Sequence, residues 1–444
     1  MRRSMAVNLP LKPNVIVALF VFYTLIIYFC FRMDTAPKCA CDSERIILEL
    51  EQRLREQHRD LPAPTSPPAP QDYCTDTDRN ADPNHSKNHL EFWRHLSSPL
   101  VEEQREQWQR FAQSVSPYPE ERFGGSGVVF TAGNKDTLEL TLVSVHMLRK
   151  LGCHLPVEIW HLTDEKPPAD ISLPANVQLR DLGSPENVHP AVRRHDADKN
   201  FQIKAAAIIN SRFEDVLYLD SDNLPVRDPT PLFASEGYKK TGAVFWPDYW
   251  KTHKENAIWR VLGVRCLDEW EQESGQIVVN KRRGWKPLQL AWYFQNEYEF
   301  YFQLLNGDKD TFRFAWKALE QPYHMMPHFV AAAGVKVGDR WCGHSMLQHG
   351  DDGKPLFIHA NLMKITDRRV LGDHPWQGVK RYLTSRRNTR LRPEFWISYD
   401  GRACMDFMGG EGEPETTVDD FEQVLPGFRD LYFQVGGKGG EERG

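Results

Sequence analysis

The chain has 444 residues, with 61 acidic and 55 basic side chains and a formal net charge of −6. This length leaves room for a membrane anchor, a spacer and one large folded domain. Because the net charge is negative, the surface has no broad cationic field for a nucleic-acid backbone, and we expect no nucleic-acid partner.

An uncharged apolar segment, VIVALFVFYTLIIYFCF, covers residues 15–31. As a helix it would span about 25 Å, which is at the short end for a membrane span and suits the thinner membranes of the early secretory pathway. The basic residues Arg2, Arg3 and Lys12 precede it, so the positive-inside rule places the N-terminus in the cytosol. We therefore predict a single-pass type II signal-anchor with a lumenal remainder. A cleaved signal peptide is the alternative, although its apolar core is usually shorter.

The segment after the anchor has the composition of a stem. Residues 43–59 alternate charged side chains with a short apolar stripe, and residues 61–71 read LPAPTSPPAPQ, a stiff extended spacer. A solvated stalk is the simpler interpretation, and weak self-association through the stripe is the alternative. Asn84 begins the sequon Asn84-His85-Ser86, which predicts lumenal glycosylation. Some of the eight cysteines should pair in an oxidising lumen, but their spacing does not give the connectivity.

The pattern that follows predicts one catalytic domain. We divide the chain into a cytosolic tail (1–14), the anchor (15–31), the stem (32–86), the catalytic domain (87–435) and a flexible tail (436–444). In the domain, strand patterns are expected at 127–131, 157–162, 177–181 and 216–219, and helical patterns at 137–151 and 204–213. This alternation predicts an α/β fold, a Rossmann-like mixed sheet with helices on both faces. Ligands of such sheets bind at the carboxyl ends of the strands.

Two carboxylates follow the carboxyl end of the strand predicted at 216–219. The segment VLYLDSDNLPV places Asp220 and Asp222 directly after the apolar run 216–219. Residues i and i+2 of an extended segment point to one side, and paired carboxylates suit a hard divalent cation. An acidic surface turn is the alternative, and the buried strand in front argues against it.

The segment VLYLDSDNLPVRDPTPLF resembles the D-x-D region of the fungal Golgi α-mannosyltransferases of glycosyltransferase family 71. Further segments are similar to that family in the same order: GGSGVVFTAG, LPVEIWHL, TGAVFWPDYW, ESGQIVVNK and GDKDTFRFAW. The resemblance covers nearly the whole lumenal part. It implies a GT-A fold, a GDP-mannose donor, Mn²⁺ or a similar divalent cation, and retention of the α-anomeric configuration.

The donor and metal residues follow from these segments. The resemblance implies that His359 joins Asp220 and Asp222 as a metal ligand and that Lys364 holds the leaving diphosphate. The remaining donor-binding candidates are Thr131, Ala132, Gly133, Lys204 and Ser221. An ordinary βα turn at 131–133 and a surface role for Lys204 stay open as alternatives.

The sugar-binding candidates come from two later segments. Glu273, Asp308 and Asp310 are the candidate catalytic carboxylates, and we expect Glu273 and Asp310 to act on the sugars and not on the ion. The candidate acceptor-binding residues are Trp246, Asp248, Ser274, Gly275 and Gln276. The alternatives are an N-cap at Asp308 or Asp310, a polar loop at 273–276 and a core turn at 245–248.

We expect a retaining, metal-dependent α-mannosyltransferase in the Golgi lumen that uses GDP-mannose and a mannosylated glycan acceptor. The alternatives are a transferase for another nucleotide sugar, a haloacid-dehalogenase-type phosphatase, which also uses D-x-D after an apolar strand, and a non-catalytic glycan-binding protein.

Overall fold

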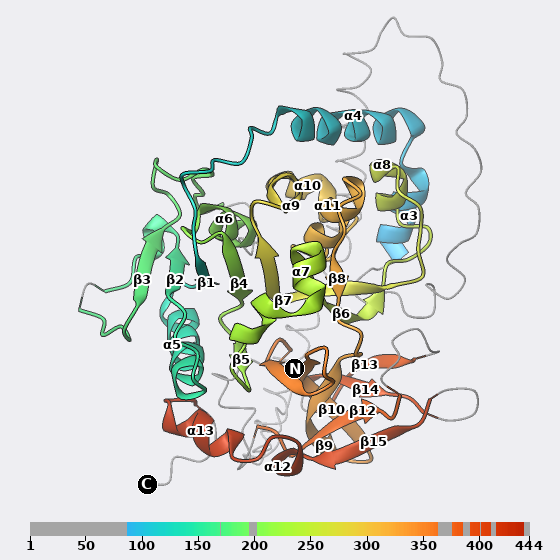
Figure 1. Ribbon diagram of the computed structural model, residues 1–444. Coiled ribbons are helices and arrows are strands. Elements are labelled where there is room, and N and C mark those ends of the chain that lie inside the picture. Colours follow the sequence, from blue (N-terminus) through green and yellow to red (C-terminus); the bar gives the residue numbers. More distant parts are fainter. Residues whose placement is uncertain are drawn as a thin grey trace, which may run out of the picture. The chain divides into compact units, whose positions relative to one another are not determined.

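The computed structural model describes residues 87–168, 170–194, 202–362, 375–384, 391–399, 401–409 and 414–438. The predicted anchor, the stem, the sequon at Asn84 and Lys364 lie outside these ranges. Among the described residues, none of the helices has the length and apolar character needed to cross a membrane. The described part of one compact unit is residues 87–100, with α3 (Lys87–His95) and the start of α4 (Ser98–Ser114). The second unit holds all the elements below (Figure 1).

A seven-stranded mixed sheet forms the first layer of the second unit, in the order β3-β2-β1-β4-β7-β6-β8. The first four strands in this order are parallel, whereas β7 runs antiparallel to both β4 and β6. Their bounds are β1 Ser126–Thr131, β2 Val157–His161, β3 Val177–Asp181, β4 Asp215–Leu219, β6 Ala243–Lys251, β7 Trp270–Asn280 and β8 His324–Met325. The predicted α/β fold is confirmed, and the four predicted strands match β1 to β4 within one residue at each end.

Helices cover both faces of this sheet. On one face, α5 (Lys135–Lys150) packs Val145 and Leu148 into the same apolar cluster as Phe130 of β1. Asn134 caps this helix, because its side chain accepts a hydrogen bond from the Thr137 backbone N–H. On the other face, α6 (Ile203–Asn210) packs against β1 and α9 (Trp285–Asn296), and α9 also packs against α11 (Thr311–Ala318).

The expected helix 204–213 ends earlier, at Asn210, because the chain turns at Ser211 to enter β4. The shorter helices are η1 Thr163–Glu165, η2 Thr230–Ala234, α7 Glu236–Thr241, α8 Ile258–Leu262, α10 Tyr298–Tyr301, α12 Phe421–Val424 and α13 Phe428–Gln434.

The second unit also contains an eight-stranded sheet, which none of the four predicted strands belongs to. Its main path is β13-β14-β10-β9-β12-β15, and β11 pairs with both β10 and β5. The bounds are β5 Asn223–Pro225, β9 Ala331–Val337, β10 Arg340–His349, β11 Pro355–His359, β12 Gly378–Tyr382, β13 Pro393–Ile397, β14 Ala403–Phe407 and β15 Thr416–Asp420. A disulfide between Cys342 and Cys404 joins β10 to β14, and Cys266 is also disulfide-bonded.

The segment after β4 connects the two sheets. The chain leaves the first sheet at Leu219, turns through 220–222 and enters β5, which pairs antiparallel with β11. In this pairing Asn223 lies opposite His359. The D-x-D segment and the end of β11 therefore meet where the two sheets join.

Candidate metal centre

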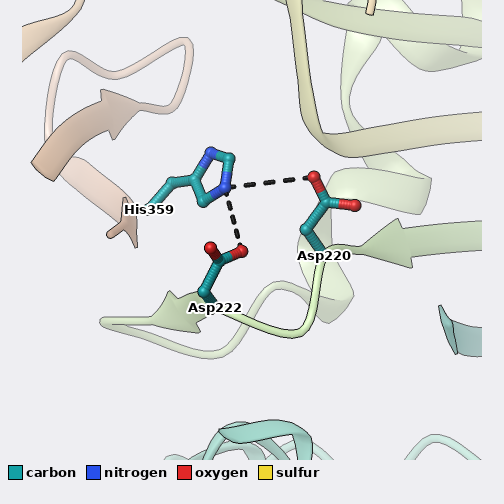
Figure 2. Close-up of side chains that lie close together, drawn as sticks. All are labelled: Asp220, Asp222 and His359. Atoms are coloured by element: carbon teal, nitrogen blue, oxygen red, sulfur yellow. Dashed lines mark hydrogen bonds and ion pairs between the residues drawn. The ribbon is translucent and has the colours of Figure 1, made fainter. Parts of the chain in front are cut away.

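Asp220, Asp222 and His359 converge at this junction, and their potential ligand atoms all lie within 4.8 Å of one another. Nε2 of His359 is 3.1 Å from Oδ1 of Asp222 and 3.9 Å from Oδ2 of Asp220. Figure 2 shows both carboxylates directed toward the same imidazole nitrogen. The three side chains thus surround one small volume that each of them can reach with a single ligand atom.

Backbone geometry fixes the two sides of this group. The Asp220 backbone N–H donates to the Gly275 carbonyl at 2.8 Å, and the Ala360 N–H donates to the Asp222 carbonyl at 3.0 Å. Gly275 is needed here because a Cβ at that position would overlap the His359 ring. Asn223 closes the turn by donating from its side chain to the Gly275 carbonyl at 2.6 Å. The turn is therefore held by β7 and by the end of β11.

Lys204 lies on the other side of Asp220. Its Nζ is 3.1 Å from an Asp220 oxygen and 2.9 Å from Oδ2 of Asp308, and it donates to Oγ of Ser274 at 2.9 Å. The lysine is buried, which argues against the surface role. Tyr218 adds a hydrogen bond to Oδ1 of Asp220 at 2.9 Å. These contacts join α6, β4 and β7 around one carboxylate, which still keeps 24% of its side chain exposed.

Charge is unbalanced around this group. Four carboxylates, those of Asp220, Asp222, Glu273 and Asp308, face one ammonium and one imidazole. Burial by itself lowers the pKa of His359, but the neighbouring Glu273 and Asp222 carboxylates outweigh it and raise that pKa to about 10. Burial raises the pKa of Asp220 despite the nearby Lys204 charge. The raised pKa of His359 favours its protonated, positive form, and the raised pKa of Asp220 favours its neutral form, so both shifts reduce the negative charge of the group.

The donor set fits a divalent cation. Two carboxylates and one imidazole are ligands that Mn²⁺ accepts, and three protein ligands leave positions for a substrate. A cation bound there would also balance the excess of carboxylates. The residues expected from the sequence to bind metal are therefore brought together, and their chemistry matches the expectation.

Glu273 lies beside the imidazole. Its Oε1 accepts a hydrogen bond from Nδ1 of His359 at 3.0 Å and another from the Gly275 backbone N–H. Its Oε2 accepts from the side-chain amide of Gln276. Burial raises the pKa of this carboxyl, but the His359 charge and hydrogen bonds more than offset that effect, so the pKa lies below its ordinary value. The segment 273–276 is part of β7 and not the polar loop that was the alternative.

Asp310 belongs to a different cluster, which we call the arginine cluster: Asp310, Arg313, Glu269, Thr252 and Lys317. Arg313 donates from Nε to Oδ1 of Asp310 at 2.7 Å and from Nη2 to Oδ2 at 2.5 Å. Arg313 also pairs with Glu269 at 2.6 Å, and the Gln272 backbone N–H donates to Asp310 at 2.9 Å. Burial raises the pKa of Asp310, but the Arg313 charge lowers it by a larger amount, so the pKa lies below its ordinary value. The alternative of a side-chain N-cap is not met at Asp310, because its side chain makes no capping hydrogen bond to α11.

The segment 245–248 is a strand within β6 and not a turn. Trp246 is fully buried in the core of the first sheet, where its indole N–H donates to the His349 carbonyl at 2.8 Å. The ring has no exposed surface in this structure and lines no open pocket, and its acceptor-binding role stays a prediction. Asp248 is also buried, and its Oδ2 pairs with Lys309 at 2.7 Å.

The remaining candidates lie at the end of β1 and in the D-x-D turn. The Thr131 hydroxyl is 2.7 Å from that of Tyr218, which connects it indirectly to Asp220. The Ala132 N–H already donates to the Trp160 carbonyl at 2.9 Å. Gly133 lies against the Glu165 side chain, where a Cβ would not fit. Ser221 lies half-buried between the two aspartates.

Sequence reasoning missed Tyr218, Asn223 and Arg313. Each is a polar residue in or next to a recognised motif that also has a partner distant in the sequence. These partners are Thr131 for Tyr218, Gly275 for Asn223 and Glu269 for Arg313. A cavity of about 260 Å³ was also missed, on the second sheet, lined among others by His328, His349, Arg381 and Tyr382. None of the candidate site residues lines it.

The chain matches the family model of mannosyltransferases Mannosyl_trans3 over residues 125–265 and 266–350, just over half of its length. The chain belongs to this mannosyltransferase family. The matched range includes β1, the D-x-D turn, β7 and the arginine cluster, and it ends shortly before His359.

Curated relatives come from yeasts. The chain is 27% identical over 322 residues to alpha-1,2-mannosyltransferase MNN21 of Candida albicans, covering 58% of this chain and 48% of that protein. It is 24% identical over 301 residues to alpha-1,2-mannosyltransferase MNN2 of Saccharomyces cerevisiae, covering 56% and 49%. The aligned part thus spans about half the length of these relatives.

Among solved structures, the galactosyltransferase LgtC with donor and acceptor sugar analogs has 15% sequence identity and a TM-score of 0.30, covering 44% of this chain and 71% of that one.

Proposed function

We propose that the protein is a metal-dependent mannosyltransferase with a GT-A fold that transfers α-mannose from GDP-mannose to a mannose-containing glycan. The observation that carries the proposal is the convergence of Asp220, Asp222 and His359 at the carboxyl end of β4, in a chain of a mannosyltransferase family. The alpha-1,2-mannosyltransferase names of the yeast relatives support the same donor sugar.

The roles of the metal ligands follow from the charge that develops during transfer. When the bond between the anomeric carbon and the phosphate breaks, negative charge accumulates on the diphosphate. Asp220, Asp222 and Nε2 of His359 would hold a Mn²⁺-type ion that neutralises this charge. Asp222 is almost fully buried and anchors the site, whereas Asp220 is open enough to face the donor.

Lys204 has a positioning role in this proposal. It bridges Asp220 and Asp308, two carboxylates that would otherwise repel each other near the reacting sugar. It also holds Ser274, the neighbour of the glycine that contacts His359. The expected contact of Lys204 with the donor would thus be indirect, through the carboxylate that it fixes.

Asp308 is the carboxylate that we place beside the transferred mannose. Of the three candidates, Asp310 has both oxygens bound by Arg313, and Glu273 has both oxygens engaged within β7 and β11. Asp308 pairs through Oδ2 with Lys204, which lies next to the metal ligands. A retaining reaction by double displacement would use this carboxylate as its nucleophile, and a same-face route would use it to stabilise the cationic sugar.

We further propose that the enzyme acts in the Golgi lumen, attached through the predicted type II anchor at residues 15–31. The two cysteines paired between β10 and β14 support an oxidising compartment. The acceptor-binding roles of Ser274, Gly275, Gln276 and Asp248 and the donor-binding roles of residues 131–133, Ser221 and Lys364 remain part of this proposal.

The direct test is to incubate the purified full-length protein with GDP-mannose, a simple α-mannoside and Mn²⁺, and to follow the product by mass spectrometry. We expect an added hexose that α-mannosidase removes, and loss of transfer with EDTA. UDP-glucose and UDP-galactose serve as donor controls. Preference for either of them would replace the proposed donor. Binding of mannoside without turnover would favour a glycan-binding protein, and hydrolysis of p-nitrophenyl phosphate would favour a phosphatase.

A further inference from the structure

We infer that Glu273 is a positioning residue that acts through His359, by fixing the orientation and tautomer of the imidazole so that Nε2 faces the cation. The inference rests on the proposed metal dependence. In this role Glu273 contacts a ligand of the cation and not the sugars, which were the contact expected from the sequence.

The imidazole of His359 lies between two carboxylates. Nδ1 of His359 lies 3.0 Å from Oε1 of Glu273, and Nε2 lies 3.1 Å from Oδ1 of Asp222. The two ring nitrogens thus face different carboxylates on opposite sides of the ring. A neutral imidazole that binds a cation through Nε2 must carry its proton on Nδ1, and Glu273 is the acceptor placed to keep it there.

The side chain of Glu273 is itself held rigidly. Its side chain is 5% exposed, and its oxygens accept hydrogen bonds from the Gly275 backbone N–H and the Gln276 amide. Gln276 is held in turn by Asn223, which donates to its Oε1 at 2.7 Å. Asn223 directly follows Asp222, so this chain of hydrogen bonds returns to the metal ligands. A side chain fixed in this way orients its neighbour and has little freedom to rotate toward a substrate.

Gly275 lies directly against the imidazole. A Cβ on Gly275 would overlap both Nδ1 of His359 and Oε1 of Glu273. The glycine therefore lets the histidine and the glutamate meet against the backbone of β7. This close approach explains the glycine by packing between protein groups and needs no bound sugar.

Glu271 provides a matched control. It is a buried carboxylate two residues earlier in β7, and it pairs with Lys309 at 2.8 Å and accepts from Thr252 at 3.0 Å. Its loss should disturb β7 to a degree comparable with the loss of Glu273. Of these two glutamates, Glu273 is the one that contacts the imidazole, so its removal and not that of Glu271 should change the nitrogen ligand of the cation.

The experiment measures Mn²⁺ binding to the full-length protein in the presence of GDP, by calorimetry and by pulsed electron paramagnetic resonance, which detects a directly bound ¹⁴N. We expect the wild type to show a nitrogen coupling that H359A lacks. E273A should weaken Mn²⁺ binding about 10- to 100-fold, the usual range for the loss of a residue that orients a metal-bound histidine, and should lose or alter the coupling. E273Q, whose amide oxygen can still accept from Nδ1, should recover part of the affinity, and E271A should keep the coupling.

A double-mutant cycle separates positioning from general damage. If Glu273 acts through His359, E273A should have almost no further effect on Mn²⁺ affinity in an H359A background, whereas independent damage would add. An unchanged coupling in E273A, or additive losses in the cycle, would overturn the inference and leave the proposed function intact. Absence of Mn²⁺ binding by the wild type would instead refute the metal dependence on which the inference rests.

Discussion

Two buried charge clusters contact strand β7, and they differ in how their charge is balanced. The metal cluster comprises Asp220, Asp222, Glu273, Asp308, Lys204 and His359, and its carboxylates outnumber its permanent cations by four to one. The arginine cluster pairs Asp310 and Glu269 with Arg313 and Lys317, so its charges cancel. We therefore expect the first cluster to bind an external cation, whereas the charges of the second are balanced by its own residues.

This difference separates carboxylates that belong to the metal centre from carboxylates that only stabilise the fold. Both Glu273 and Asp310 are buried, and both have a lowered pKa. The partners distinguish them, because Asp310 is bound by a guanidinium with no exposed side-chain surface, and Glu273 is bound by an imidazole that also faces two aspartates. We therefore expect changes in the metal cluster to reduce activity and changes in the arginine cluster to reduce stability.

The largest expected effect is on activity. Asp222→Asn should lower mannosyl transfer by about 1,000-fold or more, because the loss of one ion ligand removes several kcal/mol of charge stabilisation while the side-chain volume is kept. Initial rates at saturating Mn²⁺ measure the loss, and the thermal unfolding midpoint tests whether the fold is kept. Turnover close to that of the wild type would contradict the metal assignment.

The next effect is on stability. Arg313→Met should lower the free energy of unfolding by about 3 to 5 kcal/mol, because it leaves Asp310 buried without its partner. Urea unfolding of the purified protein measures this loss. Arg282→Met is the control, since Arg282 is 44% exposed in its pair with Glu214 and should cost less than about 1 kcal/mol. Equal losses in the two variants would show that the arginine cluster has no special structural role.

Cation binding should affect the two clusters differently. Mn²⁺ at about 100 times its dissociation constant should stabilise the wild type by about 2.7 kcal/mol, because it binds the folded state only. Arg313→Met should gain the same amount, whereas Asp222→Asn should gain much less. Thermal melts with and without Mn²⁺ provide the measurement. If the stability gained with Mn²⁺ depended on Arg313 and not on Asp222, the cation would bind in the arginine cluster, and the metal assignment would be contradicted.

The smallest effect concerns the metal-free protein. Because burial raises the Asp220 pKa, ionised Asp220 disfavours folding, and this penalty grows as pH rises from the ordinary aspartate pKa through the raised one. Asp220→Asn should therefore be slightly more stable than the wild type at neutral pH with EDTA. The lowered Asp310 pKa has the opposite sign, so its contribution to stability is present above the ordinary pKa and is lost as pH falls. Asp310→Asn should be less stable, and equilibrium unfolding at pH 7 compares the two.

The sequence by itself determined the local features of this protein. Apolar runs with turn residues between them predicted β1 to β4 and α5, because their periodicity depends on neighbours a few residues apart. The two aspartates after an apolar strand indicated a cation site, since the direction of their side chains follows from two-residue periodicity. The placement of His359 as a third ligand came from the family resemblance.

Only the tertiary structure decided which charged groups meet. His359 lies 137 residues from Asp222 and 86 from Glu273, so no local pattern could reveal that Glu273 contacts the imidazole. The same holds for part of the second sheet. Strands β9, β10 and β11 pair with their neighbours in sequence, as do β13 and β14, but β5 pairs with β11, β10 with β14 and β12 with β15 only when distant segments align. The sequence predicts that Trp246 and Asp310 contact sugars. In the structure Trp246 is buried in the core, and Asp310 is held by the Arg313 guanidinium in the arginine cluster. The function of a polar side chain depends on its partners, and long-range packing selects those partners.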